Sequence, residues 1–202
     1  MQLSLILAHP QPGSFNHAIA DAASAEARAN GHDVRVHDLY AERFDPVLSG
    51  AEIPEAAALE PQLALHCREI AAADGIVIVH PNWWGQPPAL LTGWIDRVIR
   101  PGVAYRFQQG DGGEGVPIGL LRARAALVFN TSNTTAERER EAFGDPLETI
   151  WKRCIFGLCG VATVHRETFS VVVTSTPEAR AGWLSRVRTA VSRHFPERPR
   201  DA

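Results

Sequence analysis

The chain has 202 residues, of which 45% are hydrophobic and 21% are charged, an ordinary composition for a soluble globular protein. This length suffices for one well-buried domain and is short for two, so we expect a single domain over residues 1–202. A formal charge of -3, without any basic run, argues against nucleic acid as the main partner.

The cysteines and the apolar runs bear on the cellular compartment in which we expect the protein. Cys67, Cys154 and Cys159 are odd in number and lack metal-ligand or C-x-x-C spacing, so we expect reduced thiols and no metal site. The chain starts on an apolar strand without a basic leader segment, and its apolar runs are too short to span a bilayer. We therefore expect a cytoplasmic protein without a membrane span.

The first part of the chain predicts a strand, a helix and a second strand. Residues 3–8 form an apolar run that ends in a polar loop, residues 9–16. Residues 17–30 are rich in alanine, lack internal glycine and proline, and stop before a glycine, which is typical of a helix. Residues 33–39 alternate apolar and polar side chains, the pattern of a strand nearer the sheet edge.

The middle of the chain holds the most unusual loop. A long connection over residues 41–58 and a helix over about residues 60–73 lead to a β-branched run, residues 76–79. That run is typical of a strand buried on both faces, as in a parallel sheet. It opens into a proline-stiffened loop, residues 81–88, that carries two adjacent tryptophans. The indoles either plug the sheet end or a subunit interface, or they form a platform for a flat aromatic ligand.

The remaining elements complete an alternating pattern. They are a helix over residues 88–99, a glycine-rich turn over 110–115, a strand over 125–129, a polar loop over 130–135, a helix over 146–158, a strand over 163–173, an amphipathic helix over 178–194 and a frayed tail over 196–202. Strands that alternate with helices predict a three-layer α/β sandwich around a parallel sheet. A flavodoxin-like sheet with five strands in the order 2-1-3-4-5 fits this chain.

In such a sheet, ligands bind outside the carboxyl ends of the strands, where the loops 9–16, 81–88 and 130–135 converge. The first loop leads into a helix N-terminus, which suits a phosphate because free N–H groups and the helix dipole point at one place. The alternative is a plain helix cap made by Ser14 or Asn16. No Lys or Arg lies in this loop, so amides, hydroxyls and His9 would hold an anion.

The third loop offers hydroxyl and amide groups that suit the polar edge of a heteroaromatic ring, although an ordinary solvated turn has the same composition. Neither a Walker A motif nor G-x-G-x-x-G is present. The histidines lack metal-ligand spacing, and the spacing indicates no Ser-His-Asp arrangement or carboxylate pair. The sequence therefore assigns no catalytic residue.

Several motifs follow one another in a familiar order along most of the chain. They are His9 with Ser14-Phe15-Asn16, then Pro81-Asn82-Trp83-Trp84, residues 88–98, residues 104–107 and residues 158–160. Together they resemble the NAD(P)H:quinone oxidoreductase family of flavodoxin-like flavoproteins. The resemblance implies an enzyme that passes hydride from NAD(P)H through flavin N5 to a quinone or similar acceptor. It favours FMN, with FAD as the alternative, because the segment between the second and third strands is short.

The resemblance also implies where the flavin would bind. Its phosphate would lie on the first loop, its ring against the tryptophan loop, and its polar edge at the third loop. The predicted cofactor-binding residues are His9, Ser14, Phe15, Asn16, Pro81, Asn82, Trp83, Trp84, Gly85, Thr131, Ser132 and Asn133. Members of the family are typically homodimers with the flavin near the interface, where Tyr105 and Phe107 would line the substrate pocket.

One departure from the family leaves the proton donor unassigned. The mammalian members have a glycine pair in the third loop, followed by a Tyr and a His that are credited with a proton relay, and residues 132–138 contain neither. Two other functions stay open at this point. A flavodoxin-type electron carrier would share the fold and the flavin but should be more acidic. An ancillary regulatory subunit of a potassium efflux system would carry the same motifs.

Overall fold

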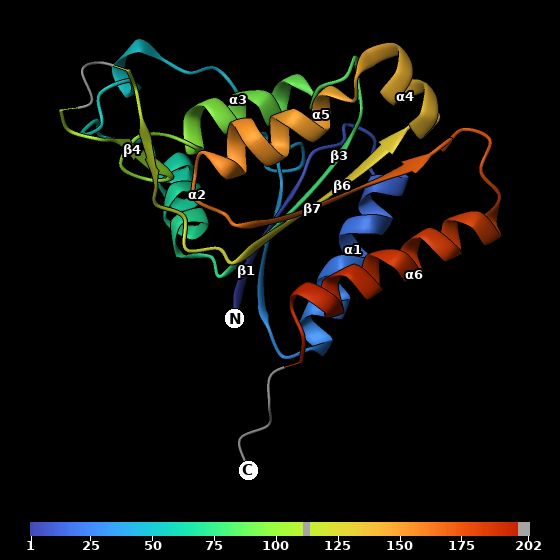
Figure 1. Ribbon diagram of the computed structural model, residues 1–202. Helices are drawn as coiled ribbons and strands as arrows, with labels where there is room; N and C mark the ends of the chain where they lie inside the picture. The colour runs from blue at the N-terminus through green and yellow to red at the C-terminus, as the bar shows by residue number, and fades with distance from the viewer. Residues whose placement is uncertain (111–113, 198–202) are drawn as a thin grey trace.

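The computed structural model describes residues 1–110 and 114–197, which form an α/β sandwich of three layers (Figure 1). The central sheet is parallel, with the strand order β2-β1-β3-β6-β7. Numbered among themselves along the chain, these strands have the order 2-1-3-4-5. The predicted flavodoxin-like fold and its strand order are confirmed.

The strands of the main sheet are β1 (Gln2–Leu7), β2 (Asp33–Asp38), β3 (Gly75–Pro81), β6 (Ala125–Ser132) and β7 (Thr163–Ser170). The helices are α1 (Phe15–Ala29), α2 (Pro61–Ala72), α3 (Ala89–Val98), α4 (Ala136–Phe143), α5 (Pro146–Thr149) and α6 (Pro177–His194), with a 3-10 turn η1 (Gly50–Glu52) and a π-helical segment η2 (Ile150–Gly157). Two short strands, β4 (Tyr105–Phe107) and β5 (Pro117–Gly119), pair as an antiparallel hairpin.

The sheet separates two apolar cores. Helices α1 and α6 cover one face, and α2, α3 and the α5–η2 segment cover the other (Figure 1). Successive strand residues point to opposite faces, so Val79 packs in the first core with Val187 while Ile78 packs in the second with Trp94 and Trp151. Strand β3 is buried along its whole length, as its β-branched run predicts.

The structure corrects the prediction in several elements. Strand β4 and helix α4 lie in stretches for which the sequence predicted no strand or helix, and η2 is π-helical within a predicted helix. Strands of three residues are too short to show alternation, and α4 has no apolar stripe to mark it. Strands β3 and β6 also extend into the loops predicted after them, whereas β7 ends at Ser170, three residues early.

Two predictions fall partly outside the described residues. These are the glycine-rich turn over residues 110–115, of which 111–113 are not described, and the frayed tail over 196–202, of which only 196 and 197 are described. Among the helices within residues 1–110 and 114–197, none is both long enough and apolar enough to cross a membrane.

Candidate functional site

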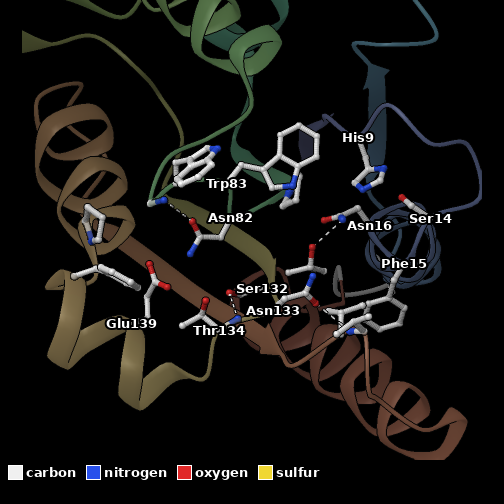
Figure 2. Close-up of a pocket in the computed structure, with 18 residues that line it drawn as sticks. His9, Ser14, Phe15, Asn16, Asn82, Trp83, Ser132, Asn133, Thr134 and Glu139 are labelled. Carbon is white, nitrogen blue, oxygen red and sulfur yellow. Dashed lines mark hydrogen bonds between the residues drawn. The ribbon is translucent and has the colours of Figure 1, made fainter.

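A cavity of about 800 Å³ opens at the carboxyl ends of β1, β3 and β6 (Figure 2). Cofactor and small-molecule sites typically enclose roughly 300–1,000 Å³. Its walls contain all twelve predicted cofactor-binding residues: His9, Ser14, Phe15, Asn16, Pro81, Asn82, Trp83, Trp84, Gly85, Thr131, Ser132 and Asn133. The rest of the lining is Thr134, Glu139, Phe143, Pro146, Val172 and Val173. The three loops therefore meet as the topology requires.

Two backbone hydrogen bonds join these loops. The Ala8 amide donates to the Val79 carbonyl at 3.0 Å, and the Asn82 amide donates to the Thr131 carbonyl at 2.7 Å. These bonds continue the parallel ladders of the sheet by one residue beyond each strand end. The cavity is thus built on the rigid edge of the sheet.

The two residues predicted for the substrate pocket lie elsewhere in the chain. Tyr105 and Phe107 are on β4, with ring centroids 5.5 Å apart, and neither lines this cavity. Phe107 is exposed. The structure does not bring either residue to the cavity within one chain, so their part in a substrate pocket requires a second subunit and stays a prediction.

The first loop ends in an open helix N-terminus. Ser14 is the N-cap residue of α1, but its side chain makes no capping hydrogen bond. Its Oγ lies 2.8 Å from His17 Nδ1 instead, and His17 Nε2 lies 3.2 Å from Asp38 Oδ2. The His17 amide donates to the Ser14 carbonyl at 3.0 Å, whereas the Phe15 and Asn16 amides have no hydrogen-bond partner among the described residues and are left for a ligand at the positive end of the dipole.

This Ser14–His17–Asp38 chain was not evident from the sequence, because α1 and β2 bring the residues together only in the fold. His9, by contrast, lies at the cavity itself. Burial lowers the pKa of His9, and the hydrogen bond with Gln11 offsets this only in part. His9 is therefore neutral at neutral pH and adds no charge for an anion.

Asn16 presents an acceptor without a partner. Its Nδ2 donates to Thr131 Oγ1 at 2.9 Å, while its buried Oδ1 has no hydrogen-bond partner among the described residues. A buried acceptor left unsatisfied costs roughly 1–3 kcal/mol. A hydroxyl or N–H donor of a ligand in the cavity would remove this cost.

The tryptophan loop is a tight hairpin turn that carries Trp84 at its tip. Trp83 and Gln86 exchange two backbone hydrogen bonds of 3.2 and 3.1 Å, and between them Trp84 and Gly85 have φ of 59° and 73°. This is the geometry of a type I′ turn, which favours Asn-Gly. A non-glycine residue in this conformation costs roughly 1–2 kcal/mol. Trp84 is nonetheless 98% exposed, so burial of its ring does not offset that cost.

Gly85 lets the same loop approach the wall formed by α5. A Cβ at this position would lie 2.6 Å from Pro146 Cγ, closer than carbon atoms can pack. The Gly85 amide also donates to Asn82 Oδ1 at 3.0 Å, which fixes the orientation of the Asn82 side chain. Glycine is therefore required here by both conformation and space.

A buried network of hydrogen bonds connects the strands and helix that form the walls of the cavity. His80 Nδ1 donates to the Pro81 carbonyl at 2.8 Å, and His80 Nε2 accepts from Asn130 at 2.7 Å and from Trp151 at 2.9 Å. Burial lowers the pKa of His80 to about 3, so the ring is neutral with its proton on Nδ1. Arg166 extends the network, donating to Asn130 at 2.8 Å and contacting Asp145 and Glu148 on the α5 side.

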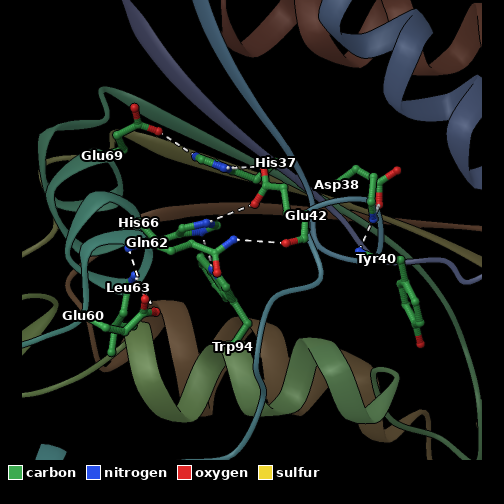
Figure 3. A network of polar contacts seen from close by, with 11 residues as sticks. His37, Asp38, Tyr40, Glu42, Glu60, Gln62, Leu63, His66, Glu69 and Trp94 are labelled. Atoms are coloured by element: carbon green, nitrogen blue, oxygen red, sulfur yellow. Dashed lines mark hydrogen bonds and ion pairs between the residues drawn. The ribbon is translucent and has the colours of Figure 1, made fainter.

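A second polar network lies away from the cavity, between β2, α2 and α3 (Figure 3). Ligand-type atoms of His37, Glu42 and His66 lie within 4.8 Å of one another. The indole N–H of Trp94 donates to His66 Nδ1 at 2.9 Å, and His66 Nε2 donates to Glu42 at 3.1 Å. His37 contacts Glu42 and Glu69 at 2.9 and 2.6 Å. His66 Nδ1 thus accepts a hydrogen bond, and the ring nitrogens that face Glu42 and Glu69 donate, so these contacts form a hydrogen-bonded network.

Sequence reasoning missed Glu139, the one carboxylate among the described residues that line the cavity. It lies in a helix whose sequence, AEREREAF, is dense in charge and typical of a solvated surface. Only the fold turns this position inward, and Glu139 is 6% exposed. No periodicity in the sequence could have marked it.

Comparisons with known proteins agree with this geometry. The family model described as a flavodoxin-like fold matches residues 1–191. An uncharacterized NAD(P)H oxidoreductase of Haemophilus influenzae is 31% identical over 89% of both chains. NAD(P)H dehydrogenase [quinone] 1 of Cavia porcellus is 32% identical over 91% of this chain and 74% of its own.

A solved structure extends the likeness to the whole fold. The NAD(P)H:quinone oxidoreductase from Methanothermobacter marburgensis superposes with a TM-score of 0.79 at 26% identity, covering 100% of this chain and 99% of that one. The family and the class of enzyme expected from the sequence are confirmed. The chain belongs to the flavodoxin-like family, to which it is joined by similarity to an NAD(P)H oxidoreductase and to NAD(P)H dehydrogenase [quinone].

Proposed function

We propose that the chain is a flavin-dependent NAD(P)H oxidoreductase that passes hydride from NAD(P)H through the flavin to a quinone or similar small acceptor. One observation carries the proposal: a single cavity joins an open helix N-terminus, a buried acceptor without a partner and an exposed aromatic side chain. These features suit a phosphate, a hydroxylated chain and a flat ring. A flavin nucleotide combines all three.

The residues of the cavity fit such a group. The first-turn amides of α1 and the Ser14 hydroxyl would hold the phosphate, since no Lys or Arg lines the cavity among the described residues. Asn16 Oδ1 and Thr131 would meet the hydroxyls of the ribityl chain. The tryptophan loop would support the ring, and Ser132 and Asn133 would meet its polar edge. When bound, the flavin would supply the two-electron chemistry.

The chain contributes orientation and shape to that chemistry. The neutral His80 holds the Pro81 carbonyl, and through Asn130 and Arg166 it ties β3 and β6 to the α5 wall. These contacts fix the cavity before any ligand arrives, which reduces the cost of ordering on binding. The apolar rim around Trp84 would exclude water from a ring that it covers.

We propose FMN as the bound flavin, with FAD as the alternative, and a homodimer in which Tyr105 and Phe107 line the acceptor pocket. The short segment between β2 and β3 supports FMN, because it offers little surface for an adenine. An open cavity and a formal charge of only -3 support an enzyme over an electron carrier, which needs no space for nicotinamide. A regulatory subunit of a potassium efflux system would share this site, and no described residue favours it.

The purified protein tests the proposal directly. We expect a yellow protein with flavin absorbance, release of FMN identified by mass spectrometry, and oxidation of NADH or NADPH that depends on an added quinone. Apoprotein should regain the cofactor and the activity when FMN is restored. Protein that takes up neither FMN nor FAD would contradict the proposal.

A further inference from the structure

Helix α4 buries a charged side chain and exposes an apolar one, the reverse of the usual pattern. Among its residues, Glu139 is the buried one, and Phe143 one turn later is 56% exposed, although both line the cavity. A helix that packed on its own protein would bury the phenyl ring and expose the carboxylate. Figure 2 shows the Glu139 side chain pointing from α4 into the cavity. This face of α4 is therefore built toward a ligand.

No partner within the protein satisfies the Glu139 carboxylate. In residues 1–110 and 114–197, none lies within hydrogen-bonding or ion-pair distance of its side-chain oxygens. The other titratable residue of the lining, His9, lies across the cavity in Figure 2. The buried Arg166 is already engaged by Asp145 and Glu148. The Glu139 carboxylate therefore faces the cavity without a protein partner among the described residues, and a ligand bound there is the group that can supply it with positive charge or N–H donors.

The surroundings of Glu139 define the shape of that ligand. Phe143, Val173 and Trp84 are exposed apolar side chains of the same lining, so the carboxylate lies beside an apolar surface. A flat ring would cover this surface, and a positive charge on the ring would meet the carboxylate. We infer that Glu139 recognises a positively charged heteroaromatic ring, namely the oxidised nicotinamide ring that the reaction produces.

This inference rests on the proposed function. The dihydronicotinamide ring gives up one hydrogen with both electrons of its C–H bond to the flavin, and the ring that remains carries one positive charge. A carboxylate beside the ring stabilises this charge as it develops and holds the product more tightly than a neutral analogue. Glu139 is thus a specificity-determining residue for the nicotinamide, with no proton transfer assigned to it.

The test measures equilibrium binding as well as turnover. Oxidised, flavin-loaded protein is titrated by calorimetry with 1-methylnicotinamide, which is a cation, and with nicotinamide, the neutral ring of nearly the same shape. We expect the native protein to prefer the cation, and Glu139→Gln to lose about tenfold in affinity for it while binding the neutral ring as before, the loss typical of a charged hydrogen-bond partner. Glu139→Asp, which keeps the charge, should retain part of the preference.

Glu141→Gln is the matched control, because Glu141 lies on the same helix, is exposed and does not line the cavity. It should leave the preference for the cation unchanged. An equal preference in Glu139→Gln and native protein would overturn the inference and leave the proposed function intact. Loss of flavin from Glu139→Gln alone would also overturn it, by showing that the carboxylate serves the flavin. A native protein that never binds flavin would refute the proposed function itself.

Discussion

The hydroxyl of Ser14 lies 2.8 Å from Nδ1 of His17, and this contact replaces the capping bond that a serine at a helix N-terminus usually makes. Asp38 on β2 holds the other nitrogen of the His17 ring. The Phe15 and Asn16 amides at the start of α1 therefore keep no partner among the described residues, while the Ser14 side chain stays ordered beside them. The loop thus forms an anion-binding site before the ligand binds, without any Lys or Arg.

Replacing this hydroxyl tests the anion-binding site. Ser14→Ala should weaken binding of FMN to the apoprotein by roughly 0.5–1.5 kcal/mol, because one neutral hydrogen bond is lost. Fluorescence titration of the flavin measures the affinity. The affinity of native protein should fall only modestly with added salt, since short-range hydrogen bonds dominate.

The same helix provides a control for that measurement. Ser24 is buried on α1 without a hydrogen-bond partner for its hydroxyl among the described residues, and it does not line the cavity. Ser24→Ala should leave FMN affinity unchanged. Equal affinities for Ser14→Ala and Ser24→Ala would show that Ser14 does not hold the flavin, and a steep dependence on salt would show that a charged side chain holds the phosphate.

Substitution of Trp84 should affect function and stability in opposite directions. Its φ of 59° strains the backbone, and its ring is 98% exposed, so Trp84→Gly removes strain without loss of burial. We expect the free energy of unfolding to stay level or rise by up to about 1 kcal/mol. Flavin retention or the rate of flavin reduction by NAD(P)H should nevertheless fall.

Denaturant unfolding and stopped-flow absorbance measure these two quantities. Trp84→Ala is the companion variant, because it loses the indole but keeps an unfavourable Cβ in the turn. It should share the functional loss without the gain in stability. Full flavin occupancy and native kinetics in both variants would show that the indole does not contact the flavin.

The sequence was sufficient for the sheet and for the residues that line the cavity's base. Buried strands such as β3 can be predicted from runs of β-branched residues. In a parallel sheet, the loops that follow the strands all lie at the same edge. The positions from Pro81 to Gly85 therefore followed from local pattern and topology. Their role in cofactor binding is a prediction, which the Trp84 variants test.

The residues that sequence reasoning missed owe their positions to tertiary packing. Glu139 faces inward only because α4 forms part of the cavity wall, and a charged helix gives no sign of this. Likewise, His37 and His66 are far apart in sequence and meet between β2 and α2. Three-residue strands such as β4 form because a partner strand lies beside them, which a local window does not contain.

The network in Figure 3 predicts a pH dependence of stability. Burial alone lowers the pKa of His37, but its hydrogen bonds and charge interactions with Glu42 and Glu69 more than offset this, so the pKa is raised above 6.5. Burial raises the pKa of Glu42, and its contacts with His37 and His66 outweigh this and bring it down to about 2. Protonated His37 therefore binds ionised Glu42 over the acidic to neutral range.

The sign of the effect follows from linkage. A raised pKa stabilises the fold below the unfolded value of 6.5, and this contribution is lost as pH rises through the folded pKa. The Glu42 contribution is present above its unfolded value of 4.5 and is lost as pH falls toward about 2. His37→Gln should therefore destabilise most between these unfolded values, and the difference from native protein should shrink at alkaline pH.

Urea unfolding at several pH values measures this difference. His194 is a control of opposite sign, because burial, His165 and Arg193 lower its pKa. A lowered pKa makes stability rise with pH, so His194→Gln should gain relative to native protein at acidic pH. A His37→Gln penalty that does not change between pH 5 and pH 9 would show that His37 acts through packing and not through charge.

The last prediction concerns the dimer. Phe107 and Ile118 are exposed apolar side chains on the paired strands β4 and β5, away from the cavity of their own chain. In a self-complementary interface, one such patch covers the same patch on the partner. Phe107→Glu should then yield monomers that remain folded, because the substituted side chain is half exposed. Activity per bound flavin should fall if the hairpin also walls the acceptor pocket of the partner.

Light scattering and turnover per flavin, measured at the same micromolar concentration, test both parts. Val47→Glu is the control: Val47 is 69% exposed, belongs to the connection between β2 and η1 and not to the hairpin, and the substitution introduces the same charge. It should leave the dimer and the activity unchanged. Native protein that is an active, flavin-loaded monomer at this concentration would contradict the dimer. A Phe107→Glu monomer with full activity would show that the hairpin serves only dimerisation and that the acceptor pocket lies within one chain.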